Sequence, residues 1–285
     1  MIYLVASELR AYLAREPFAA LYRPISDRLK LASYRSLSTL EFAPESTFLL
    51  CSVCNFSPTQ QTIAQQWESA LSAHDGVRVL NRPSRIPPWP RQMQQIAEAG
   101  GDAAPVWPLI EQIARPRFPM MLRQQTSDFQ VESPLITSQD DLNEILDRMV
   151  MAGADPREIW AVQVPDSDGH SGGSATTSLV KLGKAVFKFG GSVLPEDFAR
   201  MKAIIDASPM DAAAFDFVTT KSGPCLWRID ADLGRILPNL LHTSNAHMPD
   251  QALMTAIVAL DDRVDSSAKG SISLDPKSIE IALRK

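Results

Sequence analysis

The segment AAAFDFVTTKSGPCLWRIDADLGRI, residues 212–236, decides the fold that this sequence predicts. Two apolar runs flank the polar turn KSGP, a pattern typical of two antiparallel strands. Asp216 lies within the first run, and Asp230 and Asp232 follow the second. Carboxylates on neighbouring strands are a common way to hold a divalent cation against a polyphosphate. We therefore predict a hairpin that is a candidate metal site, in which Arg228 stands between the acids where a metal site would prefer another carboxylate.

The whole chain has the composition of an ordinary globular protein, with 285 residues, 45% hydrophobic and 21% charged. This length predicts about two domains or one large α/β unit. The net charge of −5 argues against general nucleic-acid binding, which needs a concentrated basic surface. No apolar run approaches the roughly 20 residues that cross a bilayer, and the N-terminus lacks the pattern of a signal peptide. Three cysteines, an odd number, form no disulfide framework, so we expect a cytoplasmic protein. From the charge and the apolar runs we expect no nucleic-acid or membrane partner.

Residues 1–105 are expected to form a small N-terminal α/β domain. The run at 25–37 has roughly helical spacing, and the apolar run at 47–54 predicts a buried strand. Ser57 and the proline after it predict the start of a helix, and a short strand follows at 77–80. This strand–helix–strand order predicts a parallel pair of strands.

Cys51 and Cys54 form a C-x-x-C motif inside the expected strand. A redox pair of this kind sits at the start of a helix, where the helix dipole lowers the thiol pKa. No second Cys/His pair lies nearby to complete a zinc tetrahedron. We interpret both cysteines as small apolar core residues.

Residues 106–262 are expected to form a second domain, followed by a polar tail at 263–285. The stretch DSDGHSGGSATT, residues 166–177, lacks the G-K-[ST] ending of a phosphate-binding P-loop. His170 within it is either a solvated side chain or a catalytic base. The expected elements are strands at 117–123 and 158–164, a strand pair at 179–189 that turns at Gly183, a helix that begins at a Ser138–Asp141 capping box, and helices at 195–207 and 248–260.

Several segments, in this order, resemble an ATP-grasp protein of the glutathione-synthetase-like branch. They are CNFSPTQQTIAQQWESALSAHDGVRVLNRPSRI, RFPMMLRQQ, SPLITSQDDLNEILDRMVMAGADPREIWAVQV, SLVKLGKAVFKFGG and FDFVTTKSGPCLWRIDADLGR, together spanning about residues 48–235. The resemblance implies an α+β and α/β architecture, in which a small N-terminal α/β domain precedes two α+β lobes that enclose an ATP cleft. Family members use ATP and Mg²⁺ to activate a carboxylate as an acyl phosphate, which an amine or thiol then attacks. Such chemistry needs cations for the triphosphate, acids for the metal and a dry cleft.

The resemblance also implies roles for cations around the nucleotide. Arg123 falls on the first-strand lysine or arginine of the family, where it would contact phosphate as a catalytic and ATP-binding residue. Gln163 falls on an acidic residue that meets the nucleotide, and its amide can still form a hydrogen bond. The Arg-Lys-Tyr of the family would fall on the Ala-Thr-Thr at 175–177, so Lys181 and Lys184 are the candidate replacements.

At the strands that hold metal in this family, the match is mixed. Asp216 matches the family aspartate, whereas Arg228 replaces the glutamate that bridges the metals. Asp230 and Asp232 replace asparagines. Two carboxylates can still hold one hard cation, opposed by the guanidinium beside them. Alternatively, Arg228 stands in for a metal by pairing directly with phosphate, which makes it a candidate catalytic residue.

Three hypotheses follow. The chain is a divergent ATP-dependent ligase that joins small-molecule or peptide carboxylates to amines or thiols. Alternatively, it is a catalytically degenerate ATP-grasp-like protein that acts as a binding or partner subunit, or it is an unrelated α/β domain. The substrate and the oligomeric state are open, with a homodimer among the options.

Overall fold

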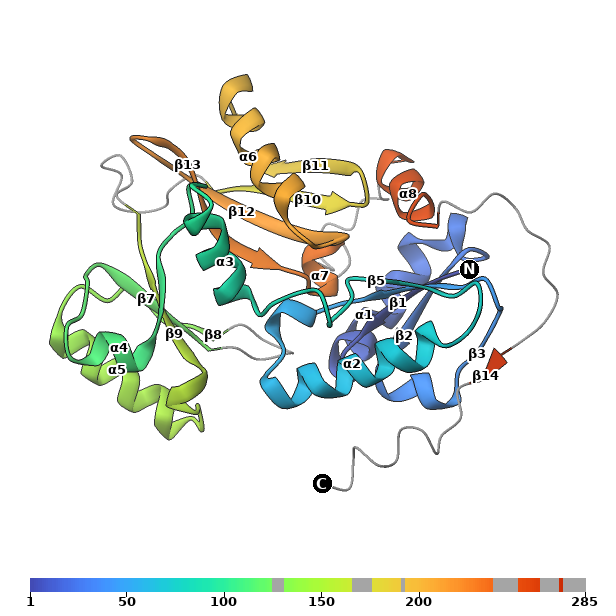
Figure 1. Cartoon of the computed structure of the whole chain (residues 1–285), viewed down its shortest axis with the longest axis horizontal. Helices are drawn as coiled ribbons and strands as arrows, with labels where there is room; N and C mark the ends of the chain where they lie inside the picture. Colours follow the sequence, from blue (N-terminus) through green and yellow to red (C-terminus); the bar gives the residue numbers. More distant parts are fainter. Residues whose placement is uncertain (125–130, 166–175, 191–192, 238–250, 262–271, 274–285) are drawn as a thin grey trace.

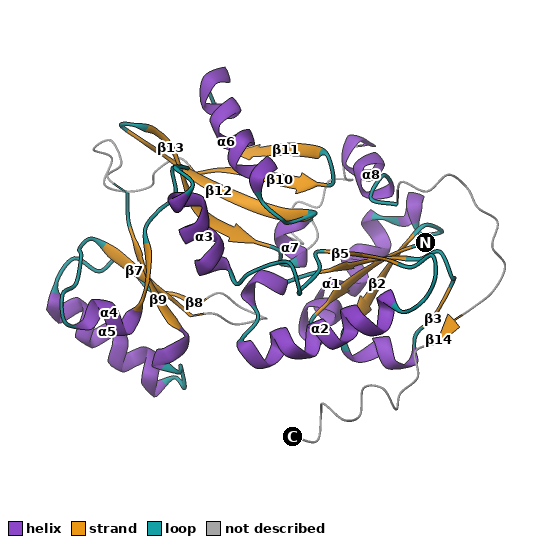
Figure 2. Cartoon of the chain, in the orientation of Figure 1, coloured by secondary structure: helices purple, strands orange, loops and turns teal. Residues whose placement is uncertain are grey.

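The computed structural model contains three four-stranded sheets, arranged from the N-terminal unit through a central sheet to an outer lobe (Figure 1). It describes residues 1–124, 131–165, 176–190, 193–237, 251–261 and 272–273. Helices lie against each sheet, as the colouring by secondary structure shows (Figure 2). The expected His170 region and nearly all of the expected tail at 263–285 lie outside the described residues.

The first sheet is parallel, with strand order β2-β1-β4-β5. Its strands and crossover helices are β1 (Ile2–Ala6), α1 (Glu8–Leu21), β2 (Leu29–Ser33), β4 (Thr47–Leu50), α2 (Pro58–Ser72) and β5 (Arg78–Leu80). The expected parallel pair is confirmed as β4 and β5, and Ser57 caps α2 in a reciprocal capping box. The interpretation of 25–37 as helical is wrong. Leu29 and Leu31 are two residues apart and pair with β1, because hydrogen bonding to a central strand overrides a weak helical pattern.

The second sheet is antiparallel, with strand order β6-β9-β7-β8, and forms a lobe with its own core. Its elements are β6 (Val106–Pro108), α4 (Leu109–Ile113), β7 (Met120–Gln124), β8 (Val131–Glu132), α5 (Gln139–Met151) and β9 (Ile159–Gln163). Helix α5 begins at the predicted capping box between Ser138 and Asp141. Leu142 and Ile145 on α5 pack with Leu122 and Ile159 of the sheet. These apolar contacts hold α5 on one face of the sheet.

The third sheet is an antiparallel sheet with strand order β11-β10-β12-β13. Its elements are β10 (Thr176–Leu182), β11 (Ala185–Gly190), α6 (Pro195–Ala207), β12 (Ala212–Thr220), β13 (Gly223–Asp230), α7 (Leu233–Ile236) and α8 (Gln251–Val258). The predicted hairpin at 212–236 is confirmed as β12 and β13. Helix α3 (Trp89–Glu98) contacts β13.

The hydrophobic core runs without interruption from the first sheet to the third. Asn81, at the end of β5, joins the two units because its side chain accepts from the backbone N of Asp211 and Ala212 and donates to the Ala212 carbonyl. The expected domain boundaries at 105 and 262 stay predictions. Short elements complete the described chain: η1 (Arg23–Ile25), η2 (Arg35–Thr39), β3 (Glu41–Phe42), η3 (Val53–Asn55), η4 (Pro156–Glu158) and β14 (Ile272–Ser273). Among the described residues, no helix combines the length and apolarity that a membrane span requires.

Candidate functional site

The predicted metal strands place their charged residues near one another on one face of the third sheet. Asp216 on β12 lies directly opposite Arg228 on β13, and Asp230 lies opposite Ala214. Side chains two residues apart on a strand share a face, so Arg228 and Asp230 lie on the same side of the sheet. Asp216 and Asp230 are only 2% and 5% exposed. The local hairpin thus brings together the acids that the sequence singled out.

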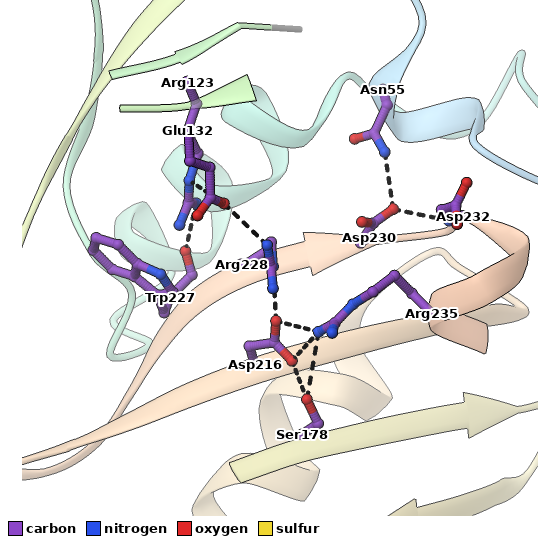
Figure 3. A network of polar contacts seen from close by, with 10 residues as sticks. All are labelled: Asn55, Arg123, Glu132, Ser178, Asp216, Trp227, Arg228, Asp230, Asp232 and Arg235. Carbon is purple, nitrogen blue, oxygen red and sulfur yellow. Dashed lines mark hydrogen bonds and ion pairs between the residues drawn. The ribbon is translucent and has the colours of Figure 1, made fainter. Parts of the chain in front are cut away.

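Asp216 is enclosed by basic and hydroxyl groups rather than by other acids (Figure 3). The Nε of Arg228 donates to its Oδ2 at 2.7 Å. Arg235 on α7 donates from Nη2 to both carboxylate oxygens, and the hydroxyl of Ser178 on β10 donates to Oδ1. Burial by itself would raise the pKa of Asp216, but the two guanidinium groups outweigh burial and hold this pKa below its usual value.

Arg228 extends the network toward the outer lobe through Glu132. Its Nη1 lies 3.0 Å from Oε1 of Glu132, and the Nε of Arg123 also lies 3.0 Å from that oxygen. Glu132 on β8 and Arg123 on β7 are directly paired residues of the second sheet. The network therefore connects the second sheet to the third.

Arg123 itself is fully buried, with 0% of its side chain exposed. Its guanidinium carbon lies 4.5 Å from the ring centroid of Trp227 and 5.6 Å from that of Trp89. Its Nη1 donates to the Trp227 carbonyl at 2.8 Å. Burial lowers the pKa of Arg123 to about 10, although Glu132 counteracts part of this effect. Arg123, which was predicted to contact phosphate, instead makes cation–π contacts with two indole rings.

Asp230 and Asp232 join the third sheet to the first. The amide of Asn55 donates to Oδ1 of Asp230 at 2.8 Å, and the backbone N of Asp232 donates to the same oxygen at 2.8 Å. Asp232 caps α7 by accepting from Gly234 N, and its Oδ2 lies 3.0 Å from the Nε of Arg10 on α1. Burial and then the charge of Asp230 raise the pKa of Asp232 to about 6.

These contacts form two groups that together contain four arginines and four carboxylates, so their formal charges cancel when all are ionised. The residues are Arg10, Arg123, Arg228, Arg235, Glu132, Asp216, Asp230 and Asp232. A hard cation such as Mg²⁺ prefers near-octahedral oxygen ligands. Within the described ranges, no group of three or more His, Cys, Asp or Glu side chains is arranged to hold a metal ion. Magnesium held against a polyphosphate needs only one or two free carboxylates, but Asp216 is paired with two arginines and Asp230 accepts two hydrogen bonds. The donor set therefore does not fit a magnesium site in this arrangement.

The remaining predicted ligands lie outside this network. Gln163 ends β9 opposite Met120, and its backbone N donates to the Pro105 carbonyl at 3.0 Å. Lys181 is three residues beyond Ser178 on β10, so its side chain lies on the opposite face of the sheet. There its Nζ donates to the carbonyls of Ile205 and Ser208. The nucleotide roles of Gln163, Lys181 and Lys184 stay predictions.

Several members of the network carried no sequence signal. Glu132 and Asn55 are far from the hairpin in the chain, and nothing in their local pattern indicated a partner on β13. Arg235 was within the segment that the resemblance covered, but its pairing with Asp216 needs the turn of α7. The one local signal was that Arg235 is a basic residue just after the strand pair that carries Asp216.

The C-x-x-C motif is buried in the core of the protein. Cys51 and Cys54 are buried free thiols, and Cys54 lies in η3 rather than in the strand that was expected to contain it. Burial raises the pKa of both thiols. The interpretation of these cysteines as small core residues agrees with their burial.

Comparison with solved structures now adds to this geometry. No family model matches the sequence, and no curated protein sequence is significantly similar to it. A RimK-domain ATP-grasp protein from Sphaerobacter thermophilus DSM 20745 superposes with a TM-score of 0.56 at 17% identity, over 91% of this chain and 98% of that one. The D-cycloserine synthetase DcsG gives 0.55 at 13% identity, over 92% and 99%. A RiPP-associated ATP-grasp ligase from Chryseobacterium gregarium, in complex with ADP and a leader and core peptide, gives 0.53 at 9%, over 91% and 95%.

The chain therefore has the ATP-grasp fold, as the segment order predicted. The likeness extends over nearly the full length of both partners in each comparison. At these identities the likeness concerns the arrangement of the backbone.

Proposed function

We propose that this chain is a catalytically degenerate ATP-grasp-fold protein that acts as a binding or partner subunit. The observation that carries the proposal is the enclosure of Asp216 by Arg228 and Arg235. In the resemblance, the positions of Asp216 and Arg228 belong to a metal-binding aspartate and glutamate. In this chain they form an ion pair with each other.

Electrostatics supports this proposal. A guanidinium group about 4 Å from a metal ion opposes it by about 4 kcal/mol per unit of metal charge at an effective dielectric constant near 20. To bind Mg²⁺, Asp216 would also have to release two ion pairs in a site where it is 2% exposed. Breaking a buried pair costs about 3–5 kcal/mol. The metal-assisted activation of a carboxylate by ATP is therefore disfavoured twice at this position.

A peptide or protein is the partner class that we favour. The backbone likeness to the Chryseobacterium gregarium ligase, which is seen with a leader and core peptide, spans 91% of this chain. A protein that keeps such a scaffold without a metal site can still use its surfaces for recognition. We infer that recognition of a peptide or protein replaces ligation in this chain.

The test is thermal unfolding of the full chain with ATP alone, with ATP and Mg²⁺, and with Mg²⁺ alone. A ligand at a hundred times its dissociation constant stabilises the native state by about 2.7 kcal/mol. We expect Mg²⁺ to add nothing to whatever shift ATP produces. A clearly larger shift with ATP and Mg²⁺ together would overturn the proposal.

A divergent ATP-dependent carboxylate–amine ligase remains the second candidate, because Asp230 and Asp232 retain two neighbouring carboxylates. The variant Arg228→Glu distinguishes a degenerate binding protein from a working ligase. If the wild-type site is degenerate, this variant gains a magnesium-dependent stabilisation that the wild type lacks. If the wild type is a working ligase, it already shows magnesium dependence and releases ADP when a carboxylate and an amine are supplied.

A further inference from the structure

A separate basic cavity is lined by residues of β5, β10, β11, α8 and the segments beside them. Figure 1 shows α8 beside the turned end of β10 and β11. Its volume is about 490 Å³, within the range of small-molecule sites. The charged residues in its lining are Arg78, Lys181, Lys184 and Asp211, three cations and one acid. The cavity lies away from Asp216, because Lys181 and Ser178 occupy opposite faces of β10.

The cavity wall is held in place by contacts from three parts of the chain. Arg78 on β5 donates from Nη1 to the Leu260 carbonyl at 3.0 Å, which fixes the segment after α8. Gly183 adopts a φ of +59° at the turn, and its backbone N donates to the Asp211 carbonyl at 2.8 Å. These contacts hold the turn that carries Lys184, which lines the cavity and is exposed.

Asp211, the acid in the lining, already accepts a hydrogen bond from outside the cavity lining. The carboxylate of Asp211 accepts from the backbone N of Asn81 at 2.7 Å. Lys181 uses two of its three N–H groups on the carbonyls of Ile205 and Ser208. Within the described part of the chain, Lys184 makes no hydrogen bond or ion pair and is exposed. Lys184 and the third N–H of Lys181 are therefore available to an anion in the cavity.

The floor of the cavity is apolar. Leu80, Leu182 and Leu260 line it and are all buried. A purely inorganic anion would leave this surface in contact with water, whereas a ligand with an apolar body would cover it.

We propose that this cavity binds a small organic oxyanion, a carboxylate or phosphate carried on an apolar body, through Lys181, Lys184 and Arg78. Guanidinium and ammonium groups recognise both kinds of oxyanion through charge-assisted hydrogen bonds. The site is independent of the function proposed above. The thermal shift with ATP and Mg²⁺ tests the Asp216 network, whereas anion titration tests this cavity. Failure of one proposal is therefore distinguishable from failure of the other.

The experiment is calorimetric titration of the full chain at constant ionic strength with benzoate, phenyl phosphate and benzyl alcohol. We expect benzoate or phenyl phosphate to bind at least tenfold more tightly than the uncharged benzyl alcohol. The tighter of the two anions identifies the head group as carboxylate or phosphate. Equal binding of benzyl alcohol, or no binding of either anion, would overturn the proposal.

The variant Lys184→Glu should weaken anion binding at least tenfold, and the matched control Lys221→Glu should change it less than twofold. Both lysines are exposed residues at the turn of a hairpin, but Lys221 lies at the turn between β12 and β13. Amide NMR shifts provide a second readout that does not depend on affinity. Shifts confined to Gly183 and its neighbours support the site, whereas equal losses in both variants would show a general effect of surface charge and contradict it.

Discussion

Asp216 and Arg228 face each other across β12 and β13, with the arginine Nε 2.7 Å from the aspartate Oδ2. Directly opposed strand residues are close enough for side chains of opposite charge to pair without strain. Arg235 approaches the same carboxylate from α7. The arrangement makes Asp216 the centre of an ion-pair network that connects the second and third sheets, and several consequences can be measured.

Replacing Asp216 with Asn should lower the free energy of unfolding by about 3–5 kcal/mol. Arg228 would keep Glu132, but Arg235 would lose the acid that it pairs with here. Urea denaturation measures the change. Asp206→Asn is a suitable control, because Asp206 pairs with Lys202 on the exposed surface of α6, where such pairs contribute less than about 1 kcal/mol. Equal effects of the two substitutions would contradict a central role for Asp216.

Asp232→Asn should change how stability depends on pH. The folded-state pKa of Asp232 is raised to about 6, above the unfolded value of about 3.9. Its stabilising contribution is therefore full below about pH 4 and is lost as the pH rises through about 6. The substitution removes this titration and keeps a good helix cap. Relative to wild type, the variant should gain about 2–3 kcal/mol between pH 4 and 7.5. Parallel stability curves in urea would show that Asp232 does not titrate in this range.

Arg123→Met and Arg123→Ala should differ clearly in stability. Methionine fills the space between Trp89 and Trp227 without a buried charge, and Glu132 still pairs with Arg228. Replacing a buried ion with an apolar residue of similar volume is often neutral, so we expect a change within about 1 kcal/mol. The alanine leaves a cavity that costs about 3 kcal/mol. Calorimetric melting of both variants provides the comparison, and a large loss in the methionine variant would show that the charge itself stabilises the fold.

The three thiols should react slowly and unequally. Burial raises the pKa of Cys225 to about 11, and Cys51 and Cys54 are more deeply buried. Iodoacetamide at pH 7.5 should modify Cys225 first and leave the C-x-x-C pair unmodified until the protein unfolds. Peptide mass spectrometry over time measures this order. Early loss of Cys51 or Cys54, or a melting temperature that falls on addition of a reductant, would point to redox chemistry at the pair.

Local patterns predicted most elements because their signals are local. The Ser57 and Ser138 caps predicted the starts of two helices, and the KSGP turn between two apolar runs predicted the central hairpin. The run at 25–37 failed because β2 is defined by pairing with β1, which no local pattern records.

The sequence by itself determined the hairpin of residues 212–236, its acids, and the order of segments that resembles ATP-grasp proteins. It also showed that an arginine occupies a position where a metal site needs an acid. Only the tertiary structure decided the consequence, since Arg228 pairs with Asp216 and with Glu132, 96 residues away in the chain. It also separated Lys181 from the acids, because alternate residues of a strand lie on opposite faces. Ion pairs depend on distances in space, and these distances are fixed when the three sheets pack together.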